Sequence, residues 1–285
     1  MPVRGDALGA ELEPSTVEVT ARMTLAYAAG VGDVGPRTFD DAGEEPLMAP
    51  PAFCVRLEWE VLLPSRSALL GLDDRERPRA VHVEQDSTFH RPIRPGDALT
   101  TRGRVVAIRG TRAGAFVRTR LLTTDARDGR PVVTSWHAAI YRDVGVRGDD
   151  GAIDDAPPVP GAPATLTGGA RLAVPRQAAH VYTECSGIWN PIHTERRAAL
   201  GLGLPDVILH GTATWAMAGR EIVNAYAGGD PGRLQRLRAR FQAPIVPGGE
   251  VGLTHGPGPE GDVHFRVSNE RGETALAGGY AQVAP

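Results

Sequence analysis

The sequence predicts an α+β protein made of two similar halves, each a long helix wrapped by an antiparallel sheet. Two internal matches indicate the duplication. The pattern Phe-x-x-Pro-Ile-x-Pro-Gly occurs at residues 89–96 and again at 241–248, an offset of 152 residues. Upstream, the segment that carries Tyr27 aligns with the segment that carries Tyr182 at an offset of 155 residues. Two matches in the same order with nearly equal offsets favour an ancient duplication over a chance repeat.

Strand and helix patterns recur in both halves. Asp128-Gly129 predicts a turn between two strands of the first half. The longest helical pattern of the second half covers residues 211–225, where Ala213 and Ala218 form a small apolar face that lets a sheet approach closely. Runs rich in β-branched and apolar residues predict four strands in each half: 81–89, 98–108, 115–123 and 132–141, then 234–241, 251–255, 263–269 and 276–283.

The two halves are expected at residues 1–144 and 170–285, with a linker at 145–169. The linker is rich in Gly, Pro, Asp and Ala, a composition that buries too little apolar surface to pack. The second half carries the chemistry-bearing motif, so the first is expected to be a degenerate repeat.

Composition restricts the function classes. With 285 residues and a net charge of −3, the chain has no electrostatic case for binding nucleic acid or an anionic membrane. Every basic residue is Arg, which indicates a GC-rich genome, such as an actinobacterial one, and excludes a Schiff-base lysine. Cys54 and Cys185 are too few for a disulfide framework or a thiolate metal site. Neither a signal peptide nor an apolar run of roughly 20 residues is found, so we expect a cytoplasmic protein.

Two short segments hold the candidate site. Ser-Gly-Ile-Trp-Asn-Pro-Ile-His at 186–193 places Asn190 and His193 just past a glycine, and Leu-His-Gly-Thr at 209–212 places Gly211 where a helix begins. A histidine can take and give a proton near neutral pH because its ordinary pKa is about 6.5. A backbone N–H at a helix N-terminus can stabilise negative charge on a carbonyl oxygen. Together these groups suit chemistry at an activated carbonyl.

The pattern Tyr182-x-x-x-x-Gly-x-x-Asn-Pro-Ile-His193 followed by Ile208-Leu-His-Gly211 resembles the MaoC-like, R-specific enoyl-CoA hydratase 2 branch of the hotdog superfamily. Residues 19–32 resemble the degenerate first repeat of its double-hotdog members. The resemblance implies a double hotdog fold and a lyase that adds water to, or eliminates it from, an α,β-unsaturated acyl thioester. The acyl group would be carried by coenzyme A or a phosphopantetheinyl acyl carrier protein. No metal or other cofactor is implied.

The resemblance also implies residue roles. His193 would transfer the proton, Gly211 would hold the thioester carbonyl through its N–H, and Asn190 would orient the reacting groups. Ile188 occupies the position of the family's catalytic Asp. Because a positioned acid–base group is worth roughly 10²–10⁴-fold in rate, this change suggests conjugate addition of a better nucleophile than water. An amine, a hydroxyl or a carbanion would serve.

Four other acids are candidate replacements for the missing Asp. Glu184, Glu195 and Asp206 lie close in sequence, and Asp33 occupies the position of Ile188 in the first repeat, where it should sit away from His193. Solvent-facing charge is the alternative for each.

Substrate contacts are expected from Ile188, Trp189, His210 and Arg238. Trp189 alternatively packs into the protein, and His210 alternatively serves as a structural residue at the helix start. Arg238 belongs to three arginines, at 236, 238 and 240, that alternate on one predicted strand face. They form either a clamp for the carrier's phosphates or a solvated face.

Two other function classes remain open at this point. The first is a non-catalytic acyl-thioester-binding protein in which Ile188 marks a decayed site. The second is a thioesterase, which usually needs a carboxylate near the helix start, where the residues around Gly211 offer none. A double hotdog already contains one pseudo-dimer, so both a monomer and a homodimer are compatible with the sequence.

Overall fold

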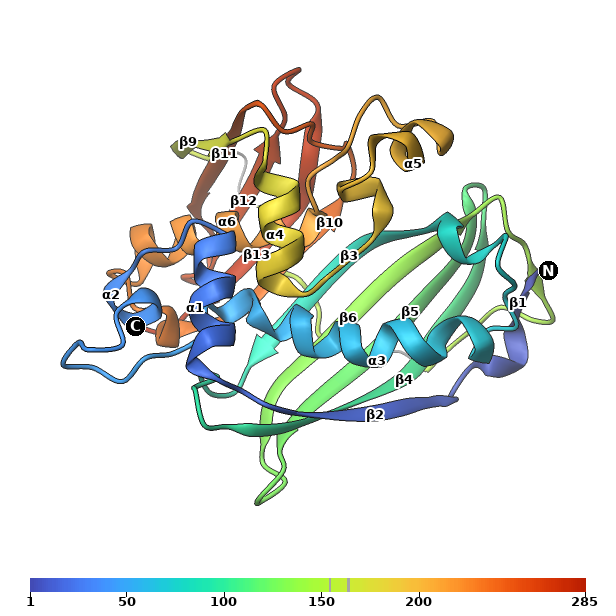
Figure 1. Ribbon diagram of the computed structural model, residues 1–285, viewed down its shortest axis with the longest axis horizontal. Helices are drawn as coiled ribbons and strands as arrows, with labels where there is room; N and C mark the ends of the chain where they lie inside the picture. The colour runs from blue at the N-terminus through green and yellow to red at the C-terminus, as the bar shows by residue number, and fades with distance from the viewer. Residues whose placement is uncertain (154, 163–164) are drawn as a thin grey trace. The chain divides into compact units, whose positions relative to one another are not determined.

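The computed structural model describes residues 1–153, 155–162 and 165–285, which form two compact units (Figure 1). Unit 1 comprises Met1–Val17, Leu57–His90 and Ala98–Val159, and unit 2 comprises Glu18–Arg56, Arg91–Asp97 and Pro160–Pro285. Packing therefore does not follow the chain order of the two expected halves, because two segments of the first half lie in unit 2. The limits of the duplicated halves, 1–144 and 170–285, are not tested by these packing units and stay a prediction.

Unit 1 is a sheet with strand order β2-β4-β5-β6-β3 and the long helix α3 (Cys54–Leu69). The strands are β2 (Glu11–Glu18), β3 (Ala80–Phe89), β4 (Ala98–Thr111), β5 (Gly114–Asp125) and β6 (Pro131–Arg142), and β3, β6, β5 and β4 pair antiparallel. Val61 and Leu62 of α3 share one apolar core with sheet residues such as Val105 and Leu121. Short strands β1 (Val3–Arg4) and β7 (Val146–Arg147) pair with each other, and β8 (Gly151–Ala152) pairs with β4.

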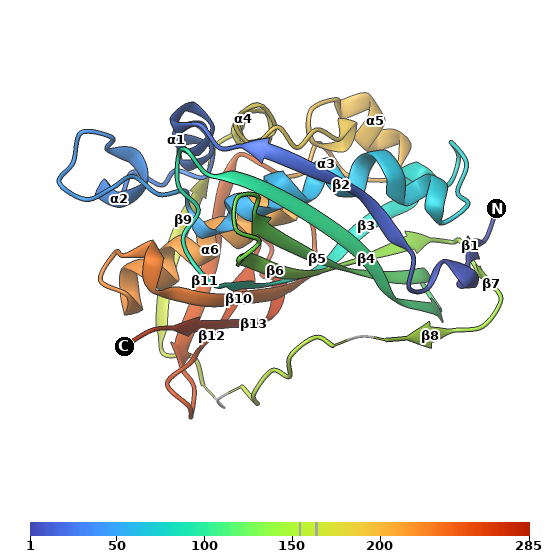
Figure 2. The same ribbon diagram turned by 90° about the horizontal axis from the view of Figure 1, so that it is seen from below.

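Unit 2 contains a five-stranded antiparallel sheet and helix α6 (Gly211–Tyr226). Its strand order is β10-β13-β12-β11-β9, formed by β9 (Gly168–Val174), β10 (Leu234–Phe241), β11 (Gly249–Pro257), β12 (Val263–Ser268) and β13 (Thr274–Val283) (Figure 2). A Cβ on Gly219 of α6 would lie 2.7 Å from a methyl carbon of Leu237. A glycine therefore lets the helix approach the sheet closely.

Unit 2 also holds α1 (Ala21–Gly30) and α4 (Ala178–Ser186), which pack against each other. The Tyr27 and Tyr182 hydroxyl oxygens are 3.1 Å apart, and Tyr27 donates to the carbonyl of Ala52 at 2.8 Å. Gly32 and Gly187 follow the two helices with φ of 66° and 70°. The equivalence of these positions supports the duplication. Short elements complete the chain: α2 (Pro36–Phe39), α5 (Arg196–Gly201), η1 (Gly5–Ala7), η2 (Pro51–Phe53), η3 (Arg77–Arg79), η4 (Pro191–His193) and η5 (Pro231–Arg233).

The eight strands and the helix predicted from periodicity are present, and the α+β fold class is confirmed. The expected linker has structure of its own, since it contains β7, β8 and the start of β9, while its positions 154 and 163–164 lie outside the described residues. Periodicity missed β2 and β9, which are both end strands of their sheets. Their Pro, Gly and acidic residues resemble loop composition, and pairing with a neighbour makes them strands.

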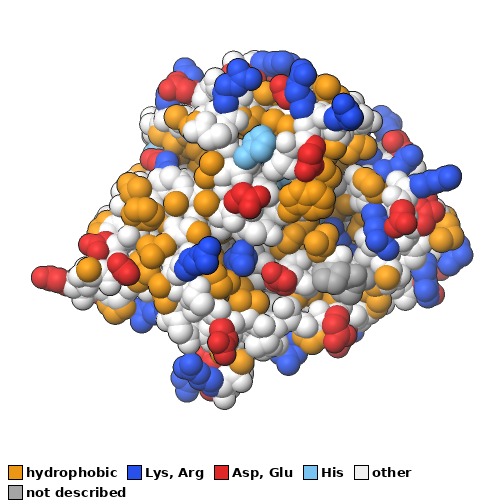
Figure 3. All heavy atoms as spheres, viewed as in Figure 1, with side chains coloured by type: hydrophobic (Ala, Val, Ile, Leu, Met, Phe, Trp, Pro, Cys, Tyr) orange, Lys and Arg blue, Asp and Glu red, His pale blue; other side chains and the backbone are white. Residues whose placement is uncertain are grey.

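Surface charge on the visible face is mixed. Basic, acidic and apolar side chains are interspersed over the face drawn in Figure 3. Among the helices that the structure describes, none is long and apolar enough to cross a membrane.

Candidate active site

The start of α6 provides a hydrogen-bond donor. Gly211 is the first residue of the helix, and its N–H has no acceptor among the described residues. A Cβ at this position would lie 2.9 Å from a ring carbon of Phe241, so a side chain would force the ring to move. The site therefore combines a free N–H with the partial positive charge of a helix N-terminus.

His193 is held by a short turn that its own sequence builds. Pro191 begins the 3₁₀ turn η4, and the Asn190 side-chain oxygen accepts a hydrogen bond from the Ile192 N–H at 3.3 Å. His193 Nδ1 lies 2.7 Å from the carbonyl oxygen of Ile208. Because a carbonyl only accepts, Nδ1 carries the proton and Nε2 carries the lone pair. Nothing in the described part of the chain hydrogen-bonds to Nε2, so this atom is available as a base.

His210 lies directly against His193. The two imidazole rings stack with centroids 3.5 Å apart and planes inclined by 22°. His210 Nε2 donates to the Ile188 carbonyl at 3.0 Å, and its buried Nδ1 has no partner among the described residues. His210 is 3% exposed. This placement favours a structural role for His210, in which it positions His193, over a direct contact with the substrate.

Burial sets the protonation state of both histidines. Desolvation lowers the pKa of His193 to about 4, and the hydrogen bond to Ile208 opposes the shift. Desolvation, with a smaller contribution from neighbouring His193, holds the pKa of His210 well below its ordinary value. Both rings are therefore neutral near pH 7, so His193 keeps a lone pair on Nε2.

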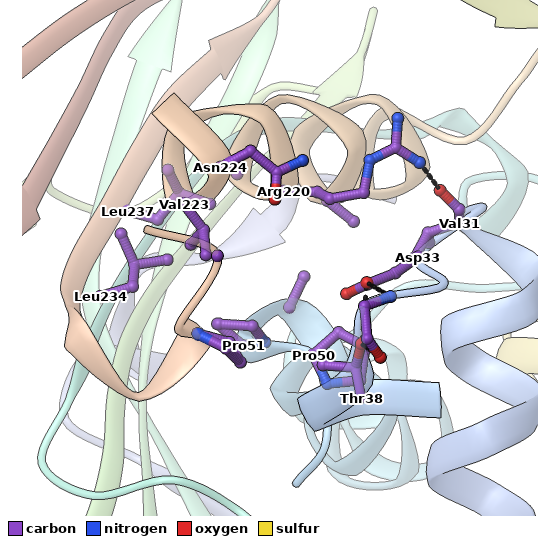
Figure 4. A pocket seen from close by; sticks show the side chains of 16 residues that line it. Val31, Asp33, Thr38, Pro50, Pro51, Arg220, Val223, Asn224, Leu234 and Leu237 are labelled. Atoms are coloured by element: carbon purple, nitrogen blue, oxygen red, sulfur yellow. Dashed lines mark hydrogen bonds between the residues drawn. The ribbon is translucent and has the colours of Figure 1, made fainter. Parts of the chain in front are cut away.

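Within the part of the chain that the structure describes, none of the four acids considered from the sequence is bonded to His193. Ile188 is buried, and none of the acids in the described residues hydrogen-bonds to His193. Glu184 and Glu195 are exposed, and Asp206 bonds the Arg196 guanidinium at 3.2 Å. Asp33 lines a pocket with other residues of unit 2, and His193 is not among them (Figure 4).

The other predicted contacts lie as follows. Trp189 is 55% exposed. Arg238 donates to the Gly278 carbonyl at 3.0 Å. Arg236 is buried over the Tyr280 ring, at 5.2 Å from its centroid, while Arg240 is exposed. A Cβ on Gly278 would lie 3.4 Å from Arg238 and 3.5 Å from Arg240, so these two side chains lie on the same side of the sheet. Substrate contact by Trp189 and Arg238 stays a prediction.

The sequence marked Tyr182 as part of the duplication and of the family motif without giving it a role, yet it supports the site. Its hydroxyl lies 3.1 Å from Thr212 Oγ1, and its ring lies 4.8 Å from the His210 ring. Burial raises the pKa of Tyr182 to about 12, so the hydroxyl stays a neutral donor. The available signal was that a tyrosine precedes both Gly32 and Gly187 by five residues.

The turn that leads into the motif requires glycine. Gly187 has φ 70°, in the left-handed region, and a side chain there would collide with the Arg56 guanidinium. Arg56 donates from Nη1 to the Ser186 carbonyl at 2.7 Å. Among the described residues no group of three or more His, Cys, Asp and Glu side chains could hold a metal ion.

Solved structures establish the class of fold. A MaoC-like dehydratase from Phytophthora capsici superposes with a TM-score of 0.84 at 22% identity, covering 98% of this chain and 97% of that one. A Mycobacterium tuberculosis protein with a double hotdog fold superposes with a TM-score of 0.62 at 15% identity, covering 97% and 96%. The protein is a double hotdog, as the sequence motif implied.

Sequence comparisons then specify the family. Residues 6–135 match the FAS1-like dehydratase domain region, and residues 154–256 match the MaoC like domain. The chain is 29% identical over 256 residues to 3-hydroxyacyl-thioester dehydratase Y of Mycobacterium tuberculosis, covering 87% of this chain and 85% of the relative. The chain thus carries a FAS1-like dehydratase region followed by a MaoC-like domain, and the resemblance drawn from the motif is confirmed.

Proposed function

We propose that the protein is a hydro-lyase that adds water reversibly to a 2-enoyl thioester, or eliminates it from a 3-hydroxyacyl thioester. The observation that carries the proposal is a pair of groups at one site that have no hydrogen-bond partner among the described residues: the basic Nε2 of His193 and the N–H of Gly211. The dehydratase domains matched in both halves, and the dehydratase relative, support the same reaction class.

In the addition direction, His193 Nε2 accepts a proton from water as the water oxygen bonds to C3. The electron pair of the C2–C3 double bond moves towards the thioester, and the enolate oxygen is held by the Gly211 N–H. The imidazolium then gives its proton to C2, which restores neutral His193. Because burial lowers the pKa of His193 to about 4, its protonated form is a stronger acid than an ordinary imidazolium and gives up this proton readily.

Neighbouring residues position these groups. Asn190 holds the turn through its side-chain oxygen, and its amide nitrogen has no partner in the described residues, so it can orient the water or the thioester. The stacked His210 fixes the plane of the His193 ring. Ile188 supplies no proton transfer, so His193 performs both transfers alone.

The substrate would arrive as a thioester of coenzyme A or of an acyl carrier protein, with no metal or further cofactor, in a cytoplasmic monomer or homodimer. A second candidate is conjugate addition of an amine, a hydroxyl or a carbanion. It is favoured by the buried Ile188 side chain and by the absence, within the described residues, of a carboxylate bonded to His193. A stronger nucleophile needs less activation than water does.

Loss of the conjugated-enoyl absorbance of trans-2-enoyl-CoA tests both candidates. We expect consumption in buffer alone, lowered about 10²–10⁴-fold by His193→Ala, and unchanged by His255→Ala, which removes a histidine that contacts Tyr226 elsewhere in unit 2. Consumption that requires added amine would show that the nucleophile is an amine and not water. Substrate binding without consumption under either condition would contradict both candidates and support a non-catalytic thioester-binding protein.

A further inference from the structure

A separate pocket lies in unit 2 between α6 and the segments around α2 and η2 (Figure 4). Its empty space, counted together with the solvent at its open side, is about 470 Å³. Pro50 and Pro51 line one side, and Val223 of α6 with Leu237 of β10 lines another. The walls are thus mainly apolar, as in most small-molecule sites.

The pocket occupies in the first repeat the place that the candidate active site has in the second. At the offset of 155 residues that pairs Gly32 with Gly187, Asp33 falls on Ile188 and Thr38 falls on His193. The prolines correspond too, since Pro36 begins α2 as Pro191 begins η4. A threonine hydroxyl is no base near neutral pH, so this place can bind a ligand but lacks the group that transfers a proton.

Asp33 supplies a buried charge at this pocket. It is 9% exposed, and its Oδ1 accepts hydrogen bonds from Thr38 Oγ1 at 2.8 Å and from the Gly35 N–H at 3.1 Å. Oδ2 has no hydrogen-bond partner in the part of the chain that the structure describes. Figure 4 shows the carboxylate directed into the space that the lining residues surround. This carboxylate oxygen is therefore open to a donor from a bound ligand or from water.

Arg220 also lines the pocket, and its hydrogen bonds go to groups other than Asp33. Its Nη1 donates to the carbonyls of Val31 and Gly32 at 2.8 and 2.6 Å. Its Nε and Nη2 both donate to Glu221, at 3.0 and 2.7 Å. The pocket therefore offers apolar walls and an acceptor with negative charge.

We propose that this pocket binds a small molecule with a hydrogen-bond-donating head, an ammonium or a hydroxyl, on a short apolar body. The head donates to Asp33 Oδ2, and the body packs against the prolines and α6. A carboxylate head is rejected, because it would place two negative charges together in a site of low polarity. The assignment is independent of the reaction proposed for His193.

Three probes of equal chain length test the chemistry: n-butylammonium, 1-butanol and butyrate, titrated against the full chain by ligand-observed NMR. We expect n-butylammonium to bind, 1-butanol to bind more weakly and butyrate not to bind. Asp33→Asn keeps the Oδ1 acceptor and removes the charge, so it should weaken n-butylammonium about tenfold or more. Binding in His193→Ala should be unchanged, which separates this pocket from the candidate active site.

A matched pair of variants tests the location without touching Asp33. Asn224 and Ala225 are adjacent exposed residues of α6, and only Asn224 lines the pocket. Asn224→Trp should block n-butylammonium, while Ala225→Trp should bind it as the native protein does. Equal binding by both Trp variants, unchanged affinity in a folded Asp33→Asn protein, or butyrate binding as tightly as n-butylammonium would each overturn the proposal.

Discussion

Ile188→Asp restores an acid–base group at the position where the family motif carries its Asp. Ile188 is 6% exposed, and its carbonyl holds His210, which in turn stacks on His193. A carboxylate at this point can share proton transfer with His193. We therefore expect water addition to trans-2-enoyl-CoA to rise by about 10²-fold, the low end of what a positioned acid–base group contributes.

The same change lowers stability. Burying an isoleucine side chain contributes about 1.5–3 kcal/mol, which the variant loses, and a buried carboxylate adds a desolvation cost. At roughly 2–4 °C per kcal/mol for a chain of this size, Tm should fall by about 5–10 °C. Ile188→Asn is the matched control, because it has nearly the shape of Asp and a similar polarity but no proton to transfer.

The assay follows enoyl absorbance at a temperature where both variants are folded. Faster hydration by Ile188→Asp than by Ile188→Asn and the native chain agrees with the account. Equal rates in the native chain and in folded Ile188→Asp would refute the reasoning that the isoleucine limits water addition.

Four further predictions concern the same site. The acid limb of kcat/KM against pH should have an apparent pKa of about 4, because burial lowers the pKa of His193; a limb near the ordinary value of about 6.5 would contradict this. The pKa of His193 is lower in the folded than in the unfolded chain, so the free energy of unfolding should fall by roughly 3 kcal/mol as pH falls from about 6.5 to 4. In urea titrations at pH 7 and pH 4, His193→Phe should show a smaller loss. Gly211→Ala should lower kcat/KM about 10–100-fold, because its Cβ would lie 2.9 Å from the Phe241 ring, whereas Gly201→Ala, whose Cβ would meet nothing within 4 Å, should not. Tyr182→Phe removes the hydrogen bond to Thr212 and should cost about 1 kcal/mol in the free energy of unfolding; an unchanged urea midpoint would show that this bond is not stabilising.

Much of the fold could be predicted because local patterns and global packing agree. The strand predicted at 234–241 has the bounds of β10, since apolar residues and flanking turns both define it. In contrast, β9 begins at Gly168-Gly169 within a segment of linker composition. Its strand character comes from pairing with β11, which no local pattern encodes.

The residue set of the candidate site was predictable, and its geometry was not. The motif placed His193 and Gly211 correctly at a turn and a helix start. The tautomer of His193 depends on the carbonyl of Ile208, a backbone atom that any residue would supply. The ring stack with His210 depends on how two segments pack. Similarly, the burial of Arg236 over the Tyr280 ring depends on the pairing of β10 with β13.

Deuterium incorporation into 3-hydroxybutyryl-CoA in D₂O tests the central claim most directly, because reversible dehydration exchanges the proton at C2 through His193. We predict that mass spectrometry detects one deuterium at C2 with the native protein and with His255→Ala, and none above background with His193→Ala. Exchange that persists in His193→Ala, or its absence in a native protein that binds the thioester, would contradict the assignment of His193 as the proton-transferring residue.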